Sequence, residues 1–482
     1  MAVLQSDLRS GTVFRLIPLR SHLGRPPILV RVGTWNGGGG CGVHAAKRED
    51  TEVKMEKMKP KICTADELHY VAVSNSDWRL ALWRYLPPPK SPPRNHPLLL
   101  LSGIGTNAIG YDLSPQSSFA RFMSGQGFDT WILEVRGAGL STHEVDFTEV
   151  TDTLEDSDVR SVNVKKTRMF SEKEQSRSAS KLSETVVHLS ERFLGFLNEG
   201  PQSVTPQLFE LQERLYTSIG GFQRQLDLIM KNDWDFDHYL EEDVPAVMEY
   251  IRTLSKPEDG KLLAIGHSMG GILLYAMLSR YGFEGKDSGL ASVTTLASSL
   301  DYRPSKSSLK LLLPLADPIQ ALNVPAVPLG VILAAAHPFA SRPPYLLSWL
   351  NALISAEDMM HPELFEKLIF NNFGNIPSKL LLQLSTVFQE GGLSDRNGTF
   401  FYKDHLGKSN VPVLALAGDQ DLICPSEAVY ETLKLLPKHL TTYRVFGEPS
   451  GPHYAHYDLV GGRLAVEQVY PCIIDFLSRH DI

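Results

Sequence analysis

The sequence has little cysteine, no long apolar run and no surplus of basic residues. Its four cysteines, among 482 residues, are scattered and form no Cys-x-x-Cys pair. This excludes a disulfide framework, disfavours a zinc site and favours a reducing compartment. The net charge is −8, so we expect no nucleic-acid partner. No His, Cys or carboxylate cluster has metal-ligand spacing, and we expect neither a metal nor a cofactor.

A membrane-spanning helix is not expected either. The most apolar stretch beyond the N-terminal region, residues 324–336, contains Pro325 and Pro328. It is also shorter than the ~20 residues that a spanning helix needs. We therefore expect a soluble chain, for which peripheral contact with a membrane surface stays open.

The N-terminal region is rich in arginine and poor in acids. Residues 1–48 hold six arginines and one acid, Asp7, and Arg15 and Arg20 interrupt the apolar residues that a secretory signal would need. An Arg-rich, acid-poor leader is typical of an organellar transit peptide, which we assign to residues 1–50. A disordered basic tail is the alternative. We favour the chloroplast over the mitochondrion or the cytoplasm.

Short apolar runs alternate with helical patterns over the rest of the chain. This alternation indicates an α/β fold with a mostly parallel central sheet and helices on both faces. The expected strands are 67–73, 78–85, 98–101, 128–135, 262–265, 293–297, 411–417 and 441–446, and the expected helices are 119–125, 233–254, 271–281, 426–435 and 465–478.

Two stretches interrupt the alternation. Residues 143–232 begin as a charged segment and continue as two apolar stripes with steps of three and four, which predict a helical hairpin. Residues 303–404 are mainly helical in pattern and punctuated by proline. We therefore expect one domain over residues 65–482, with a core of 65–142, 233–302 and 405–482 and two large insertions.

The strongest chemical signal is Gly266-His267-Ser268-Met269-Gly270, between an apolar strand and a helical run. In this context the pattern Gly-x-Ser-x-Gly predicts a nucleophile elbow. The serine hydroxyl then stands at a helix N-terminus, where N–H groups favour developing negative charge. The alternative is an ordinary glycine-rich turn. We expect His267 to pack beside the elbow rather than to act as a base.

A serine nucleophile needs a base and an orienting acid. The strand at 411–417 leads into Asp419 and Asp421, and the last strand is followed by His453 and His456. The chain order of serine, acid and histidine is that of an α/β hydrolase. Both acids and both histidines remain candidates on spacing alone.

The chain resembles α/β-hydrolase-fold proteins of the lipase and esterase type, and among these the plant hydrolases with an acidic-lipase-like core. Beyond the elbow, the resemblance rests on Gly418-x-x-Asp421-x-Ile423-x-Pro425 and on His456-x-Asp458-Leu459. It implies that Asp421 is the acid and His456 the base, and that Asp458 fixes a local turn. Residues 111–141 also resemble polyhydroxyalkanoate synthases, but those enzymes use a cysteine where this chain has Ser268.

The resemblance implies an oxyanion hole formed by the backbone N–H groups of Ile104 and Met269. The family usually has His-Gly ahead of the first of these donors, whereas this chain has Ser102-Gly103. Because the hole needs only backbone groups, activity is still expected.

The function implied is hydrolysis of a carboxylic ester. The 303–404 insertion is expected as a cap over the active site. Its apolar residues favour a hydrophobic ester or acyl lipid, unless they only form the insertion's own core. Two other functions stay open, namely an acyltransferase or thioesterase with the same triad and a non-catalytic ligand-binding receptor on the same fold.

Overall fold

The computed structural model describes residues 62–74, 76–143, 234–310, 326–343, 345 and 347–482. The predicted transit peptide and helical hairpin lie outside these residues. The main sheet runs in the order β1 (Glu67–Ala72), β2 (Trp78–Tyr85), β4 (Thr130–Leu133), β3 (Leu98–Leu101), β6 (Leu262–His267), β7 (Leu290–Leu296), β10 (Val413–Gly418) and β11 (Thr441–Phe446). The short β5 (Thr142–His143) pairs with β2.

Strand direction divides this sheet into two parts. β2 is antiparallel to both β1 and β4, whereas β4, β3, β6, β7, β10 and β11 are all parallel. The inner strands β3, β6 and β10 are buried along their whole length because both faces of the sheet are covered, whereas the edge strand β11 is partly exposed. In β3, each of the four leucines is at most 1% exposed. The predicted α/β fold with a mostly parallel sheet is confirmed.

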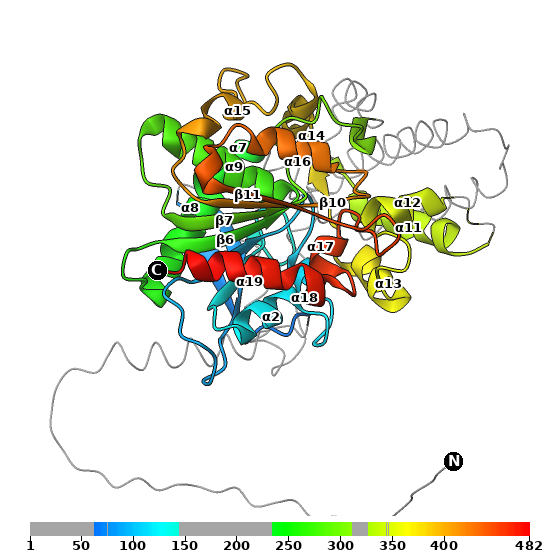
Figure 1. Cartoon of the computed structure of the whole chain (residues 1–482), viewed down its shortest axis with the longest axis horizontal. Coiled ribbons are helices and arrows are strands. Elements are labelled where there is room, and N and C mark those ends of the chain that lie inside the picture. Colours follow the sequence, from blue (N-terminus) through cyan, green and yellow to red (C-terminus); the bar gives the residue numbers. More distant parts are fainter. Residues whose placement is uncertain (1–61, 75, 144–233, 311–325, 344, 346) are drawn as a thin grey trace, which may run out of the picture. The chain divides into compact units, whose positions relative to one another are not determined.

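Helices cover both faces of the sheet (Figure 1). α2 (Phe119–Gly125) and α19 (Tyr470–Arg479) lie on one face, and α9 (Met269–Glu284) and α16 (Ser426–Leu433) lie on the other. α9 is buried from Met269 to Ser279. It therefore forms the centre of its layer and fixes the end of β6 from which it departs.

Two predicted helices are divided, each next to a proline. The expected helix 233–254 consists of α7 (Phe236–His238), a π-helical turn (Tyr239–Asp243) and α8 (Val244–Ser255), with Pro245 at the start of α8. The expected helix 465–478 is α18 (Ala465–Gln468) and α19, whose second residue is Pro471. A proline ring collides with the carbonyl four residues earlier, which a wider turn or a break relieves.

The described residues between β7 and β10 are mainly helical. They form α11 (Leu329–Ser341), α12 (Ser348–Ile354), α13 (Pro362–Asn371), α14 (Ser378–Ser385) and α15 (Tyr402–His405), with a small sheet of β8 (Ala326–Val327) and β9 (Ile376–Pro377). Single turns of 3-10 helix occur at η1 (Ala108–Tyr111), η6 (Thr386–Phe388), η7 (Leu406–Lys408) and η8 (Lys438–Leu440), and α17 (Asp458–Gly461) follows β11. Among the described helices, none has the length and apolar character to cross a bilayer.

Candidate active site

Ser268 occupies the sharp turn between β6 and α9. Its backbone angles are φ 55° and ψ −119°, in a region that residues other than glycine seldom adopt. Such strain persists only where the surrounding structure holds it, and it is frequent at functional sites. Ser268 is a partly exposed residue, although β6 before it is buried. A reactive hydroxyl at this position can therefore be reached.

Glycines on either side of Ser268 allow the close packing that holds the turn. A Cβ on Gly266 would lie 2.4 Å from backbone atoms of Gly270. A Cβ on Gly270 would lie 2.1 Å from the carbonyl oxygen of Leu101 in β3. Both distances are far below van der Waals contact, so the pattern Gly-x-Ser-x-Gly is a packing requirement of this turn as well as a motif.

His456 and Asp421 form a buried pair at the same edge of the sheet, on the loops after β11 and β10. Nδ1 of His456 lies 2.8 Å from Oδ2 of Asp421. The other carboxylate oxygen accepts hydrogen bonds from the backbone N–H groups of Ile423 and Cys424, both at 2.8 Å. His456 is 7% exposed and Asp421 3%. The acid is therefore held in one orientation, in which it can fix the imidazole ring.

The structure does not join Ser268 to His456 directly. Within the described residues, no hydrogen bond connects the Ser268 hydroxyl with the His456 ring. The two are linked through His267, the neighbour of Ser268, whose Nε2 lies 2.9 Å from the His456 carbonyl oxygen and whose ring centroid lies 4.8 Å from that of His456. Catalytic hydrogen bonds often tighten only in the complex with substrate, so this arrangement is compatible with a serine–histidine pair.

His267 itself is unsuited to act as the base. Burial, followed by electrostatic repulsion from the nearby His456 ring, lowers its pKa to about 3. The ring is therefore neutral at ordinary pH, and its Nε2–H donates to the His456 carbonyl. This hydrogen bond ties the elbow to the histidine loop.

The second acid and histidine form a separate pair. Nδ1 of His453 lies 2.5 Å from Oδ2 of Asp419, and the other Asp419 oxygen accepts the N–H of Tyr454. The side chains of His453 and Asp419 are 34% and 26% exposed. The four candidates thus divide into a buried pair next to the elbow histidine and a more exposed pair.

The expected oxyanion donors lie at the ends of β3 and β6. Ile104 is in a tight turn, closed by a 3.3 Å hydrogen bond from the Thr106 N–H to the Gly103 carbonyl. A Cβ on Gly103 would lie 3.5 Å from the Cβ of Ser268, so this turn borders the elbow. Met269 is the first residue of α9, and a first-turn N–H has no partner inside its helix. The Ile104 N–H donates to no backbone group of the described chain.

Ser102 stands where the family resemblance predicts a histidine. The hydroxyl oxygen of Ser102 is buried and has no hydrogen-bond partner among the described residues. The turn is held from its other side instead, because the Gly105 carbonyl accepts the N–H of Gly374 at 2.7 Å.

A comparison with protein-family models matches residues 96–458 to the family described as the alpha/beta hydrolase fold. This chain belongs to that family. A comparison with curated proteins gave no match.

A comparison with solved structures matches lipases and an esterase. A soluble variant of monoglyceride lipase from Saccharomyces cerevisiae is 12% identical, with a TM-score of 0.45 over 88% of this chain and 98% of that chain. An esterase from Thermogutta terrifontis is 13% identical, with a TM-score of 0.44 over 86% and 100%. A monoacylglycerol lipase from Paleococcus ferrophilus is 14% identical, with a TM-score of 0.42 over 83% and 99%.

One acidic residue of this α/β hydrolase was not expected from the sequence. Glu134 follows β4, is 3% exposed and accepts the N–H groups of Ala108 at 2.9 Å and Leu140 at 2.7 Å. Burial raises its pKa. Through the hydrogen bond from Ala108, Glu134 therefore fixes the position of the segment that follows the Ile104 turn. The signal that could have found it is an acid directly after an apolar strand and before Arg136-Gly137.

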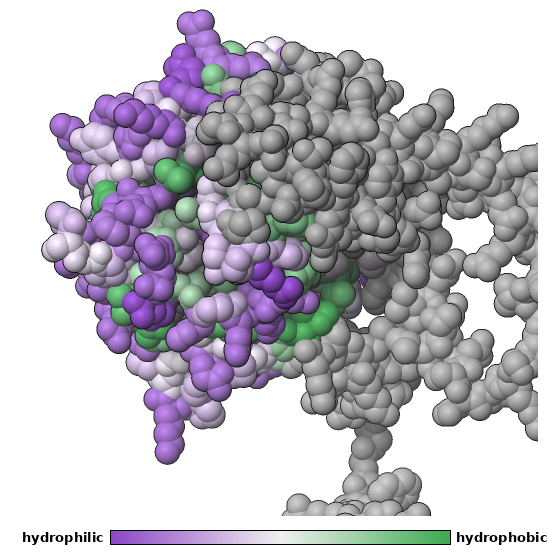
Figure 2. Space-filling model, turned by 90° about the vertical axis from the view of Figure 1, so that its right-hand side faces the viewer, coloured by the Kyte–Doolittle hydropathy of each residue, from purple (hydrophilic) through white to green (hydrophobic). Residues whose placement is uncertain are grey.

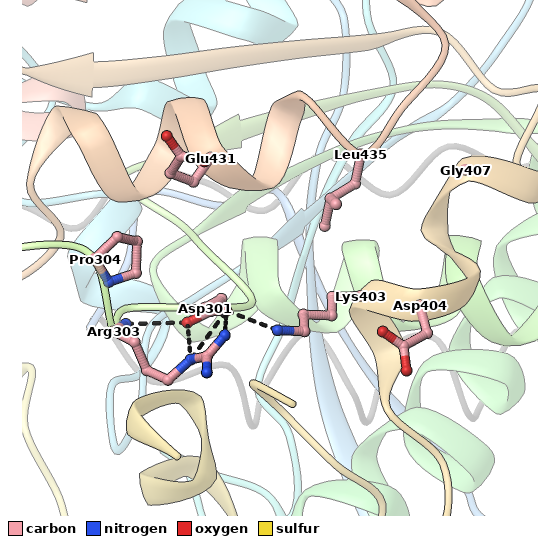
Figure 3. Close-up of a pocket in the computed structure, with 8 residues that line it drawn as sticks. All are labelled: Asp301, Arg303, Pro304, Lys403, Asp404, Gly407, Glu431 and Leu435. Carbon is pink, nitrogen blue, oxygen red and sulfur yellow. Dashed lines mark hydrogen bonds and ion pairs between the residues drawn. The ribbon is translucent and has the colours of Figure 1, made fainter. Parts of the chain in front are cut away.

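A cavity of about 660 Å³ lies away from these residues (Figure 3). It is lined by Asp301, Arg303, Pro304, Lys403, Asp404, Gly407, Glu431 and Leu435. Inside it Asp301 is paired with Arg303 and Lys403, both at 2.9 Å. The expected triad does not line this cavity. The described residues include no group of three His, Cys, Asp or Glu side chains that could hold a metal ion.

Proposed function

We propose that this α/β hydrolase is a serine esterase that cleaves carboxylic esters through Ser268, His456 and Asp421. The observation that carries the proposal is the buried hydrogen bond between His456 and Asp421, beside an elbow serine held at positive φ. A carboxylate that fixes an imidazole, next to a strained and accessible hydroxyl, is the arrangement that acyl transfer requires. The more exposed pair of His453 and Asp419 is less suited, because solvent competes for its hydrogen bond.

In the proposed mechanism, the Ser268 oxygen attacks the ester carbonyl carbon while His456 takes the hydroxyl proton. Asp421 keeps the imidazole in the required tautomer and stabilises its charged form. The N–H groups of Ile104 and Met269 stabilise the oxyanion. His456 then protonates the leaving alcohol, and an acyl group remains on Ser268. Water, activated by His456, attacks this acyl-enzyme and releases the carboxylic acid.

We propose a hydrophobic or lipid-like acyl group as the substrate feature. Residues 303–404 would form a cap over the site, and its helix α11 is built almost entirely of Leu, Val, Ile, Ala, Phe and Gly. Most side chains in the first half of α11 are only partly buried. Figure 2 looks onto the side of the molecule that carries α11, α12 and α13, and its visible part shows hydrophobic side chains among hydrophilic ones. In this proposal the apolar side chains of α11 supply surface for an acyl chain.

The acidic-lipase-like subtype and the cellular location are parts of the same proposal. Residues 1–50 would direct the chain to the chloroplast. Fusion of these residues to a fluorescent reporter tests this, and a cytosolic reporter would refute it.

Hydrolysis of p-nitrophenyl esters with acyl chains of increasing length tests the proposed activity. We expect turnover that favours longer chains, and a loss of about 10⁶-fold in kcat for Ser268→Ala, because removing a triad nucleophile disables the whole unit. Ser279→Ala is the matched control and should keep the wild-type kcat, since Ser279 is a buried serine of the same helix α9 whose hydroxyl donates to the Tyr402 carbonyl, away from the elbow. A folded wild-type protein that is inactive on every ester would refute the proposal.

A further inference from the structure

Three consecutive residues at the end of α12 are hydrogen-bonded to the loop that carries His456. We call this segment, Ile354 to Ala356, the strap. The Ile354 carbonyl accepts the N–H of Tyr457 at 2.8 Å. The Ser355 hydroxyl donates to Oδ1 of Asp458 at 2.5 Å, and the Ala356 N–H donates to Oδ2 at 2.7 Å. About a hundred residues separate these partners in the chain, so the strap joins the predicted cap to the histidine loop.

The Asp458 carboxylate is the centre of this junction. Besides the two strap donors, its Oδ2 accepts the N–H of Ala455 at 2.8 Å. Ala455 and Tyr457 flank His456, and both of their N–H groups are therefore engaged, one by Asp458 and the other by the strap. The His456 carbonyl is taken by His267. Asp458 thus completes the set of contacts that fixes the backbone from which the His456 imidazole extends.

Burial of the Asp458 carboxylate in the protein interior is energetically unfavourable. Asp458 is 0% exposed, and burial raises its pKa to about 6 although all three donors lower it. A group that only closed a surface turn would not need to lie in the interior. All three donors belong to the chain, so the carboxylate acts on the protein and not on a substrate.

The same region of the chain also holds the oxyanion loop. The Gly374 N–H donates to the Gly105 carbonyl at 2.7 Å, and the Asn107 N–H donates to the Asn372 carbonyl at 3.1 Å. Residues 354–374 therefore contact the loops on both sides of the reacting centre. The residues between β7 and β10 form part of the frame of the site as well as its proposed cover.

We propose that Asp458 is a positioning residue, which locks the strap against the histidine loop and so sets the His456 imidazole relative to Ser268. The inference rests on the proposed ester hydrolysis and adds a role for the cap in catalysis. Loss of the carboxylate leaves the buried N–H groups of Ala356 and Ala455 without an acceptor, which is unfavourable in the interior. The Ser355 hydroxyl then keeps only the Ala356 carbonyl, at 3.3 Å. The loop then relaxes and the imidazole moves away from the serine.

Two substitutions at Asp458 separate the effect of its hydrogen bonds from the effect of its charge. Asp458→Ala removes the acceptors, and we expect kcat to fall about 10- to 100-fold, with KM little changed, because small displacements of reacting groups have effects of this size. Asp458→Asn keeps an oxygen for the two N–H groups and directs its amide N–H toward the Ser355 oxygen. We expect Asp458→Asn to restore kcat to near the wild-type value.

Asp395→Ala is the matched control. Asp395 is 9% exposed and closes a turn by accepting the N–H groups of Thr399 at 2.7 Å and Phe400 at 2.9 Å and the Thr399 hydroxyl at 3.2 Å. Its replacement should lower stability but leave kcat of the folded protein unchanged. Equal losses of kcat in Asp395→Ala and Asp458→Ala would overturn the inference, as would a folded Asp458→Ala with full activity. If Asp458→Ala does not fold, Ser355→Ala gives the same test with a smaller loss.

A second readout does not depend on ester hydrolysis. The proton between His456 and Asp421 should give a low-field NMR signal in the wild type and in Asp458→Asn, and it should be weakened or absent in Asp458→Ala. A wild type that shows this signal but hydrolyses no ester would refute the proposed function and leave the positioning role supported. An unchanged signal in Asp458→Ala would overturn the positioning role whatever the activity.

Discussion

Gly270→Ala tests whether the elbow depends on the contact between α9 and β3. A Cβ at this position would lie 2.1 Å from the Leu101 carbonyl oxygen and 2.5 Å from its carbonyl carbon. These are backbone atoms of a central strand, so no side-chain rotation relieves the clash. To reach the 3.4 Å of ordinary contact, α9 must move by roughly 1 Å. Overpacking of this kind costs about 1–3 kcal/mol or more, and a shift of that size at a reacting group costs about 10²-fold in rate.

Chemical denaturation and ester hydrolysis would measure the two effects separately. Gly125→Ala is the control, because Gly125 ends α2 and a Cβ there meets nothing within 4 Å. That change should leave stability unaltered or raise it by up to about 1 kcal/mol. We expect Gly270→Ala to be less stable and about 10²-fold slower. If Gly270→Ala matches the wild type in both measurements, the packing explanation of the elbow is wrong.

Three further predictions concern buried ionisable groups. Asp421→Asn should lower kcat by about 10⁴-fold, because an amide holds the imidazole in the wrong tautomer, and near-normal turnover would argue against this acid. Burial raises the pKa of Asp458 to about 6 from a usual 3.8, so between pH 4 and 6 the native state binds a proton that the unfolded chain has lost. As the pH rises over this range, the free energy of unfolding should therefore fall by up to about 3 kcal/mol relative to that of Asp458→Asn. A difference between the two proteins that stays constant with pH would contradict this prediction. Hydrogen bonds to Asp481 and Asp259 raise the pKa of His96. The stability that His96 adds is therefore present below about pH 6.5 and is lost as the pH rises through the raised pKa of the native state. Chemical denaturation of His96→Gln at several pH values should not show this loss, and equal pH dependence in the variant and the wild type would refute the prediction.

The central strands could be predicted because burial on both faces produces continuous apolar runs. Leu98 to Leu101 is such a run, and the structure places it at the centre of the sheet. Element ends were less predictable where a polar side chain has a distant partner. The strand expected over 128–135 is limited to Thr130–Leu133, since Asp129 pairs with Arg84 and Glu134 turns inward to bind backbone N–H groups.

The candidate site could be located from the sequence but not assembled. Strand ends and turn residues pointed to Ser268, Asp421 and His456, yet local spacing could not decide between His456 and His453. Their pairing depends on which acid each loop meets in space, and the choice came from family resemblance. The contacts of the strap could not be predicted from the sequence. The hydrogen bond between Ser355 and Asp458, for example, joins residues 103 positions apart, and such contacts leave no periodic pattern.

The most direct test of the central claim is labelling with a fluorophosphonate, followed by mapping of the modified peptide. Activation of Ser268 by His456 predicts that wild-type protein is labelled on Ser268, that His456→Ala loses nearly all labelling, and that His453→Ala is labelled at the wild-type rate. Labelling that persists in His456→Ala and disappears in His453→Ala would contradict the account.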